Sequence, residues 1–391
     1  MATPQPESID IPYRDIALPP VRLVTDRQAD GTIVLRCAEP LVSFDANIIR
    51  AFYRQVSLHG EKTLYAQRRL EADGSRGDWV RQTFAQAKSD TRGIAQWLID
   101  QEVGAEDPIL ILSGNSIAHA MMRLGALTAG VPSCPISPNY AHLSGSFDRL
   151  KHVVELIQPK IIFAESADAC AAALQALDLS ERIVVSCDSQ PNKIADFSYD
   201  EIRKTPSRPE LDERIENADM DAHVVYMLTS GSTGMPKAVI QTQRMLSTNM
   251  HQAFQVLGKA AGWDDIMLDW LPWNHVSGAF GCFAAAVFGG SLYIDDGKPA
   301  PGLFNETIRN LREIPVPYFA NVPAGYAFLV DALEADEGLQ QSFFQDLRLM
   351  LYGGAGLPQP IYDRLQALAI RATGRRIFMT TGYGATETAS G

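Results

Sequence analysis

The sequence predicts an α/β fold with two mostly parallel sheets covered by helices. From about residue 107, short apolar runs alternate with longer segments of helical periodicity, and this alternation is typical of parallel sheets. Polar or glycine-rich turns follow four of the apolar runs, at 229–237, 272–278, 352–356 and 381–391. Because ligands collect at the carboxyl ends of parallel strands, these four turns predict a binding site.

The first alternation ends before residue 199. Apolar runs predict three strands, at 108–114, 160–166 and 182–188. Helices are predicted between them, at 116–130 with a terminal glycine, at 146–159 with Pro159 as its stop, and in an alanine-rich segment after residue 166. The polar stretch 199–221 predicts a surface connection between two lobes, and the first ~75 residues carry little signal.

The alternation resumes after the glycine-rich turn at 229–237. Apolar runs predict five further strands, at 266–272, 291–295, 317–323, 347–356 and 376–380. Helical periodicity predicts four covering helices, at 277–290, 302–314, 326–336 and 359–374. No internal repeat of fixed short period interrupts this pattern.

Composition and charge exclude several classes of partner. The net charge of −12 argues against general binding to nucleic acid or to an anionic membrane. The five cysteines include no C-x-x-C pair, so they predict neither a zinc site nor a disulfide framework. The N-terminus lacks the features of a signal peptide, and no apolar run reaches the ~18 residues that span a bilayer. We expect a cytoplasmic protein with a small-molecule partner; an oligomer is left open.

The segment "TSGSTGMPKAVI" (229–240) predicts a phosphate-binding loop. Its glycines let backbone N–H groups approach an anion, and its hydroxyl groups and Lys237 are suitable phosphate donors. It is not a Walker A loop, since Lys237 is followed by alanine rather than by serine or threonine. The alternative is a flexible linker of the same composition. The strands predicted on both sides, at 223–228 and 238–240, favour a β-hairpin instead.

Two further segments carry groups with defined chemistry. In "YGATE" (383–387), Tyr383 offers an aromatic face for a base, Thr386 can donate to a phosphate oxygen, and Glu387 can ligate Mg²⁺. The alternative for this segment, taken alone, is a polar turn at a domain edge. In "PWNHVSG" (272–278), His275 stands behind a tryptophan; the alternative is a core histidine bound to a backbone partner.

Taken together, the segments resemble the adenylate-forming superfamily of acyl-CoA synthetases, luciferases and peptide-synthetase adenylation domains. The resemblance covers roughly residues 100–391 and includes "LGALTAGVPSCPISPNY" (124–140) and "YGGAG" (352–356). Within the superfamily, "MLTSGSTGMPKAVIQTQRM", "DWLPWNHVSGAF" and "YFANVPAGYAFL" look like feruloyl-CoA synthases. Those enzymes activate hydroxycinnamic acids with ATP and coenzyme A.

The resemblance implies a role for each candidate residue. The β- and γ-phosphates of ATP would be held by Thr229, Ser230, Gly231, Ser232, Thr233, Gly234 and Lys237. Tyr383 and the adjacent Gly384 would contact adenine, Thr386 the α-phosphate, and Glu387 the Mg²⁺ ion. Gly353, Gly354 and Ala355 would form a floor between the acyl chain and adenine. The acid would be bound by Trp270, His275, Asn321, Val322 and Tyr326, with His275 bordering the carboxylate.

The sequence departs from this family at its end. The chain stops at Gly391, whereas the family continues with a ribose-binding aspartate, a hinge and a small C-terminal lobe that carries a lysine. We therefore expect a fragment with an incomplete β-barrel subdomain and without the C-terminal lobe. The predicted division is a first α/β subdomain with an N-terminal extension, 1–221, and a second with the nucleotide and acyl site, 222–391.

Three functional alternatives stay open. The first is a synthetase for another aromatic or medium-chain acid, because such a relative would share many of these residues. The second is an enzyme that hands its acyl group to a carrier protein rather than to coenzyme A. The third is a non-catalytic nucleotide-binding module.

Overall fold

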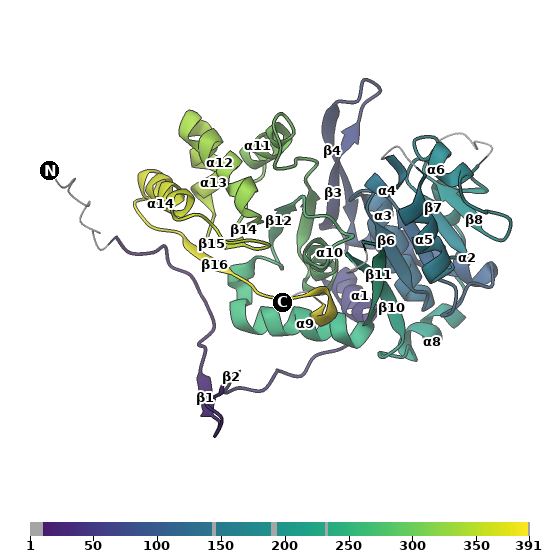
Figure 1. Ribbon diagram of the computed structural model, residues 1–391, viewed down its shortest axis with the longest axis horizontal. Helices are drawn as coiled ribbons and strands as arrows, with labels where there is room; N and C mark the ends of the chain where they lie inside the picture. The colour runs from purple at the N-terminus through teal and green to yellow at the C-terminus, as the bar shows by residue number, and fades with distance from the viewer. Residues whose placement is uncertain (1–10, 143–145, 189–193, 231–233, 390–391) are drawn as a thin grey trace. The chain divides into compact units, whose positions relative to one another are not determined.

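The computed structural model describes residues 11–142, 146–188, 194–230 and 234–389. The chain divides into two compact units that interleave along the sequence, as the colours of Figure 1 show. The larger unit comprises Phe44–Met250, Trp270–Ile294 and Gly384–Gly391. The smaller unit comprises Met1–Ser43, His251–Asp269 and Asp295–Tyr383.

A seven-stranded sheet forms the centre of the larger unit, in the order β11-β10-β6-β5-β7-β8-β9. Its strands are β5 (Ile109–Leu112), β6 (Ser133–Ile136), β7 (Ile161–Ala164), β8 (Ile183–Ser186), β9 (Phe197–Ser198), β10 (His223–Ser230) and β11 (Pro236–Thr242). All neighbours pair in parallel except β10 and β11, which form an antiparallel hairpin. Every residue of β5, β6 and β7 is buried, as expected for strands covered on both faces.

Helices cover this sheet, and their ends follow local chemistry. The helices before residue 220 are α1 (Ile48–His59), α2 (Phe84–Asp100), α3 (Ile117–Ala129), α4 (Asn139–His142), α5 (Asp148–Ile157), α6 (Ala171–Gln175), α7 (Tyr199–Ile202) and α8 (Glu210–Glu216). Helix α3 begins at Ser116, whose side chain accepts a hydrogen bond from the His119 N–H, and ends at Gly130 with a φ of 75°. The first and last residues of the predicted helix 116–130 are thus its caps.

A second sheet region of the larger unit is built from a hairpin and one later strand. Strands β3 (Thr63–Leu70) and β4 (Arg76–Thr83) pair antiparallel, and β13 (Ser291–Ile294) runs parallel to β3. Helix α10 (Val276–Phe288) packs against α1, and its Cys282 carbonyl accepts a hydrogen bond from the Tyr65 hydroxyl at 2.8 Å. Helix α9 (Gln243–Leu257) begins in this unit directly after β11.

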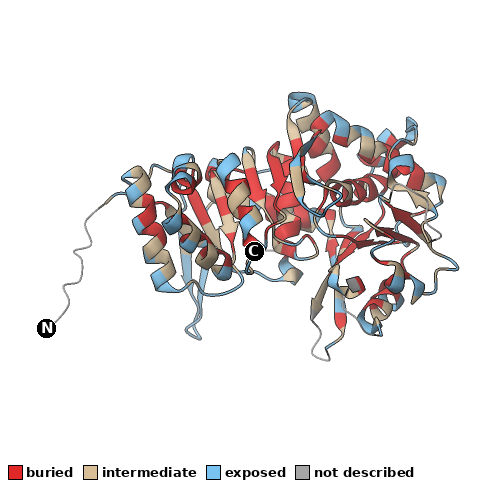
Figure 2. Ribbon diagram, turned by 90° about the horizontal axis from the view of Figure 1, so that it is seen from above, coloured by how far each residue is buried: buried red, intermediate tan, exposed pale blue. Residues whose placement is uncertain are grey.

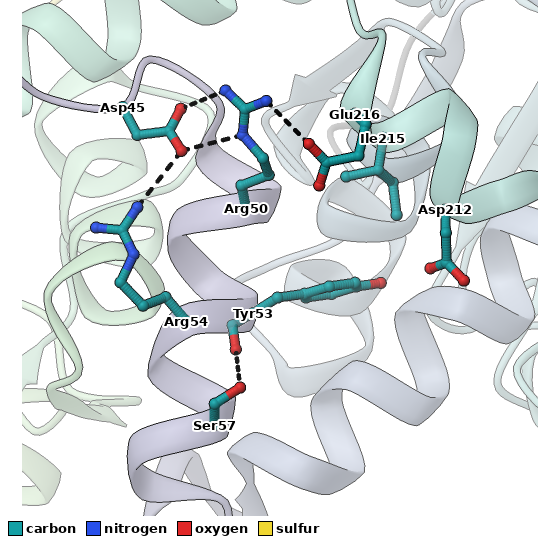
Figure 3. Close-up of a pocket in the computed structure, with 8 residues that line it drawn as sticks. All are labelled: Asp45, Arg50, Tyr53, Arg54, Ser57, Asp212, Ile215 and Glu216. Atoms are coloured by element: carbon teal, nitrogen blue, oxygen red, sulfur yellow. Dashed lines mark hydrogen bonds and ion pairs between the residues drawn. The ribbon is translucent and has the colours of Figure 1, made fainter.

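The smaller unit contains a parallel three-stranded sheet, β14-β15-β16. Its elements are β1 (Leu23–Arg27), β2 (Ile33–Cys37), η1 (Gly258–Ala261), β12 (Ile266–Asp269), α11 (Phe304–Glu313), β14 (Tyr318–Asn321), α12 (Pro323–Ala335), α13 (Glu337–Gln345), β15 (Leu349–Tyr352), α14 (Gln359–Thr373) and β16 (Phe378–Thr381). Figure 2 shows that buried residues concentrate on the strands and on one side of the helices. Phe319, Tyr326 and Phe343 are among the largest fully buried side chains.

The predicted α/β class, with two mostly parallel sheets, is confirmed, and so is the hairpin at residues 223–242. The compact units follow spatial contact and interleave, so the predicted boundary after residue 221 stays a prediction. No helix among the described residues has the length and apolar character needed to cross a bilayer.

Residues 199–221 are not the surface connection that their polar composition predicts. They contain α7 and α8, in which Ile202, Leu211 and Ile215 are buried. The Ile215 carbonyl accepts a hydrogen bond from the buried Asn47 side chain at 2.7 Å, which ties α8 to the start of α1. These three apolar side chains pack into the larger unit, although most residues around them in the sequence are polar or charged.

Candidate active site

The described parts of the glycine-rich segment are the end of β10 and the start of β11, which pair as an antiparallel hairpin. Thr229 pairs with Lys237 and Ser230 with Pro236, so the strands close directly onto the turn. The predicted phosphate ligands Gly231, Ser232 and Thr233 lie outside the described residues. Gly234 has a φ of 81°, and no atom lies within 4 Å of where a Cβ would stand. Lys237 is exposed at the start of β11, so its ammonium group is accessible to a ligand.

A histidine fixes the base of this turn. His152 on α5 donates a hydrogen bond from Nε2 to the Pro236 carbonyl, at 2.9 Å. Helix α5 also packs against β11. The strand that begins with Pro236 and Lys237 is therefore held from the covering helix.

The "YGATE" segment is bound to the same strand. Its last two residues and Thr388 form the short helix η2 (Thr386–Thr388), which contacts β11. Gln241 on β11 donates a hydrogen bond from Nε2 to the Thr386 carbonyl at 2.9 Å, and Asn249 on α9 donates to the Thr388 carbonyl at 3.5 Å. The Glu387 side chain is exposed. The fold thus uses the backbone of this segment for attachment and leaves the carboxylate of Glu387 accessible.

Strand β11 brings the two predicted nucleotide segments together. Lys237 and Gln241 are four residues apart, so in a strand their side chains lie on one face, separated by roughly 13 Å along the strand. One end of this face carries the candidate phosphate cation, and the other end anchors Thr386 and Glu387. These residues are about 150 apart in sequence, and the hairpin places them on a single element.

The "PWNHVSG" segment enters α10 along a closely packed turn. Trp273 is 1% exposed, and its ring is nearly perpendicular to that of His119, with ring centroids 5.2 Å apart. A Cβ on Gly278 would stand 2.2 Å from the Leu271 carbonyl oxygen and 2.5 Å from that of Pro272. The first turn of α10 therefore lies directly against the turn that precedes it, and only glycine fits at this position.

His275 is the N-cap of α10. Its Nδ1 accepts a hydrogen bond from the Ser277 N–H at 3.4 Å and lies 2.9 Å from the Ser277 hydroxyl. Because a backbone N–H can only donate, the neutral ring carries its proton on Nε2. Although the residue is exposed, the surrounding protein removes enough water to lower the pKa of His275. At neutral pH, His275 is thus an uncharged ring with an Nε2–H donor.

A small apolar pocket of about 10 Å³ lies where these segments meet in the larger unit. It is lined by Gln241, Leu246, Met250, Val276, Ala279, Phe280, Phe283 and Ala389. These residues come from β11, α9, α10 and, for Ala389, the position that follows η2. The space is about that of one water molecule, so the walls are in contact and a ring could enter only if side chains such as Phe280 moved.

The smaller unit carries the remaining predicted residues at the carboxyl ends of its three parallel strands. Gly353, Gly354 and Ala355 follow β15; Gly354 has a φ of 81°, and no atom lies within 4 Å of where a Gly353 Cβ would stand. Tyr383 follows β16 and is 98% exposed. The strand ends are tied together, since the Thr381 hydroxyl donates to the Tyr352 carbonyl at 2.8 Å.

Two predicted acid-binding residues are buried in the smaller unit. The Tyr326 hydroxyl lies 2.9 Å from both the Phe319 and the Leu351 carbonyl oxygens, so its proton is shared between the main chains of β14 and β15. Asn321 is 2% exposed, and its Oδ1 accepts a hydrogen bond from the Val322 N–H at 2.8 Å. This geometry gives both residues a structural role, and their contact with an acid stays a prediction. Val322 and Trp270 are partly exposed, the latter in the larger unit.

The family model for the AMP-binding enzyme matches residues 52–391. The chain belongs to the AMP-binding enzyme family. The D-alanine–D-alanyl carrier protein ligase of Bacillus cytotoxicus is 23% identical over 305 residues, which are 78% of this chain and 54% of that relative. The chain thus spans about half the length of the curated relatives it matches.

Solved structures share the fold at low sequence identity. The luciferase-like enzyme from the mealworm Zophobas morio superimposes with a TM-score of 0.68 and 16% identity, covering 88% of this chain and 74% of that one. A benzoate CoA ligase from Burkholderia xenovorans LB400 gives a TM-score of 0.66 at 19% identity, covering 88% of this chain and 62% of that one. The fold predicted from the resemblance to the adenylate-forming superfamily is therefore confirmed.

Sequence reasoning missed the residues that support the site of this AMP-binding enzyme. The Asn115 side chain binds the main chain of residues 270–273, and the buried Arg123 donates to the Trp273 carbonyl at 3.5 Å. Burial lowers the pKa of the neighbouring His119 to about 3, so that ring is neutral. The position of Asn115, just after the strand "PILIL", was the available signal, because polar residues at strand ends in α/β folds are often functional.

We expect Gly278→Ala to destabilise this AMP-binding enzyme by about 1–3 kcal/mol, the usual cost of overpacking. Both atoms that a new Cβ would meet belong to the backbone, so no flexible side chain can move away. Thermal unfolding of the two proteins measures the effect. Gly104→Ala is the matched control, since the nearest atom to a Cβ there, Asp107 Oδ2, is 3.9 Å away. Equal unfolding temperatures for Gly278→Ala and the parent would contradict the packing described here.

Proposed function

We propose that this protein activates a carboxylic acid with ATP and Mg²⁺ to an acyl-adenylate and transfers the acyl group to coenzyme A. The observation that carries the proposal is the shared face of β11. Lys237 stands at one end of this face, and Gln241 anchors Thr386 and Glu387 at the other. A cation and a carboxylate held by one strand suit the two partners of a nucleotide, its terminal phosphates and its metal ion.

The residues fit an ATP·Mg²⁺ complex. Mg²⁺ is usually held by one or two carboxylates together with substrate phosphates, rather than by a cage of protein ligands. Among the described residues no cluster of three histidine, cysteine, aspartate or glutamate side chains could hold a metal by itself. One exposed carboxylate, that of Glu387, matches the kind of site in which the nucleotide supplies most of the ligands.

The smaller unit offers groups for the base. Tyr383 is 98% exposed, which leaves both faces of its ring available for stacking. Gly353 has no side chain in the space beside it, so a planar ligand could lie against its backbone. We assign adenine to these residues.

The chain's own groups would act on the first step by reducing charge and fixing geometry. The acid's carboxylate oxygen bonds to the α-phosphorus, and the bond between the α- and β-phosphates breaks to release pyrophosphate. A carboxylate attacks a polyanion only when negative charge is neutralised and the groups are in line. Lys237 would offset charge on the leaving phosphates and Thr386 would donate to the α-phosphate. The Nε2–H of the neutral His275 would orient the carboxylate.

For the acid, we propose ferulate or another hydroxycinnamate. The support is the resemblance of the three quoted segments to feruloyl-CoA synthases, together with the partly exposed Trp270 and the apolar side of α10. Aromatic walls favour flat acids, because offset stacking adds about 0.5–1.5 kcal/mol beyond burial. The pocket beside α10 would have to open for such a ring.

We therefore expect ferulate, p-coumarate and caffeate to give higher kcat/KM than unsubstituted cinnamate or C8–C12 fatty acids. The proposal requires that a polar group of the opened site binds the phenolic hydroxyl, whereas a flexible chain gains little from aromatic walls. The measurement is CoA-thioester formation with each acid at saturating ATP and coenzyme A. If octanoate or decanoate has the highest kcat/KM, the hydroxycinnamate proposal is wrong, while acid activation in general is retained.

A second acceptor is suggested by the curated relatives, which are named as ligases of D-alanine to a carrier protein. The same first step would serve either acceptor. Acid-dependent exchange of pyrophosphate with ATP, with no thioester formed when coenzyme A is added, would favour the carrier protein. Binding of ATP without exchange for any acid would favour a nucleotide-binding module.

A further inference from the structure

The side chain of Asn115 forms a clamp on the turn that leads to His275. Its Nδ2 donates hydrogen bonds to the Leu271 carbonyl at 2.9 Å and the Trp270 carbonyl at 3.4 Å. Its Oδ1 accepts a hydrogen bond from the Trp273 N–H at 2.9 Å. Both donor hydrogens and the acceptor are therefore used on one short stretch of main chain.

The clamp needs an amide. An aspartate has the shape of asparagine but, when ionised, accepts only, so it could keep the bond from the Trp273 N–H and would repel the two carbonyl oxygens. An alanine would lose all three bonds. The position can thus be probed in two steps, first by removing the donors and then by removing the whole group.

The clamped turn is held on its other sides too. Arg123 on α3 donates to the Trp273 carbonyl at 3.5 Å, and its guanidinium lies 4.5 Å from the centre of the Phe283 ring on α10. The ring of the buried Trp273 also packs against that of His119, which, like Arg123, is on α3. Asn115, just before α3, and Arg123, in the middle of α3, therefore bind the main-chain N–H and carbonyl of Trp273, two residues before His275.

We propose that Asn115 is a positioning residue for the acid, acting by fixing the turn Trp270–His275. The inference rests on the function proposed above, because it assigns His275 to the acid's carboxylate. Displacing a group near a reacting atom by about 1 Å can cost roughly 100-fold in rate. The phosphate and metal groups are on β11 and on the segment bound to it, so loss of the clamp should leave nucleotide binding unchanged.

The test compares Asn115→Asp and Asn115→Ala with the parent in the full chain. Calorimetry measures the Kd for ATP·Mg²⁺, and acid-dependent pyrophosphate exchange measures kcat/KM for the acid. Hydrogen exchange of the peptide containing residues 270–278, followed by mass spectrometry, reports the clamp independently of activity. The matched control is Asn47→Asp, since the buried Asn47 also uses its amide to hold main chain, at the start of α1.

We expect Asn115→Asp to lower kcat/KM for the acid by roughly 10- to 100-fold and to speed hydrogen exchange at 270–278. The Kd for ATP·Mg²⁺ should change less than twofold. Asn47→Asp should leave kcat/KM for the acid and exchange at 270–278 unchanged. The inference is overturned if hydrogen exchange at 270–278 in Asn115→Asp stays at the parental rate. It is overturned too if hydrogen exchange there becomes faster while kcat/KM for the acid does not fall. It is also overturned if Asn47→Asp lowers kcat/KM equally.

The Asn115→Asp variant keeps one bond, so it provides a result even where Asn115→Ala does not fold. Failure of the proposed function has a separate signature: the parent itself would bind no ATP·Mg²⁺ or show no acid-dependent exchange. In that case an unchanged rate of hydrogen exchange at 270–278 in the Asn115 variants would still show that Asn115 does not fix the turn.

Discussion

Glu387→Gln is expected to abolish most of the Mg²⁺ dependence of ATP binding and to lower acid-dependent pyrophosphate exchange roughly 100-fold or more. Removing outer partners of a metal site already costs about 10–100-fold, so loss of the ligand's charge should cost at least as much. The fold should be unaffected, because the Glu387 side chain is exposed while the backbone of its segment makes the anchoring contacts. Calorimetry of ATP with Mg²⁺ and with a chelator measures the first effect directly.

The control for this variant is Glu181→Gln, which removes the same charge from another exposed position. Its ATP affinity should keep the full response to Mg²⁺. If Glu387→Gln has the parental rate of pyrophosphate exchange at limiting Mg²⁺, this residue does not bind the metal ion. If the unfolding temperature of Glu387→Gln falls far enough to explain the loss of activity by unfolding, the residue instead has a role in the fold.

Lys237→Ala is expected to lower kcat/KM for ATP by roughly 10- to 100-fold. Hydrogen bonds to charged groups contribute about 1.5–3 kcal/mol, and ~1.4 kcal/mol corresponds to a factor of ten. Lys237→Arg should restore part of the activity, because it keeps the charge but not the compact shape of the ammonium group. The measurement is exchange kinetics at varied ATP, with the acid saturating.

Lys259→Ala is a suitable control, since that lysine is also highly exposed, at 80%, and makes only a 3.8 Å contact with Asp264. It should leave the ATP kinetics unchanged. If Lys237→Ala has the parental kcat/KM for ATP, this lysine does not hold the phosphates. An effect that is equal in both lysine variants would indicate general attraction of the nucleotide by charge.

The parts of the fold that could be predicted are those set by short-range patterns. The short apolar run "ILIL" predicts a buried strand beside helices of clear periodicity, and Gly130 and Gly374 end their helices with positive φ values, 75° and 69°. The hairpin at 223–242 followed from two apolar runs around a glycine-rich turn. These features need only the chemistry of neighbouring residues.

The supporting residues could not be predicted because their roles depend on distant partners. Asn115 binds residues about 155 positions away, and its place just after a strand indicates a functional position but not which segment it contacts. The family resemblance implied that Tyr326 meets the acid; the structure shows its hydroxyl bound to strand carbonyls in the core, and contact with an acid stays a prediction. A tyrosine in a strand–helix junction is equally suited to both uses, and only the packing decides between them.

The capping box of α2 shows a different kind of omission. Thr83 and Gln86 form reciprocal hydrogen bonds at the start of this 17-residue helix, and the pattern can be read from sequence. The apolar residues of α2, however, are mixed with charged residues that form ion pairs with later parts of the chain. An example is Asp90, which pairs with Arg203. Such residues obscure the periodicity, because their partners come from other parts of the chain.

The attachment of residues 384–389 to β11 has a consequence for how the larger unit forms during synthesis. Gln241 finds its partner 145 residues further along the chain, and the intervening 295–383 belongs to the smaller unit. Closing so long a loop has a large entropic cost, which the smaller unit would reduce by folding first and shortening the effective loop. Until residue 389 leaves the ribosome, the Gln241 amide and the wall that Ala389 completes beside Val276 would be open to solvent. A nascent chain halted before "YGATE" is therefore expected to expose apolar surface beside α10, and to be a target for chaperones at that stage.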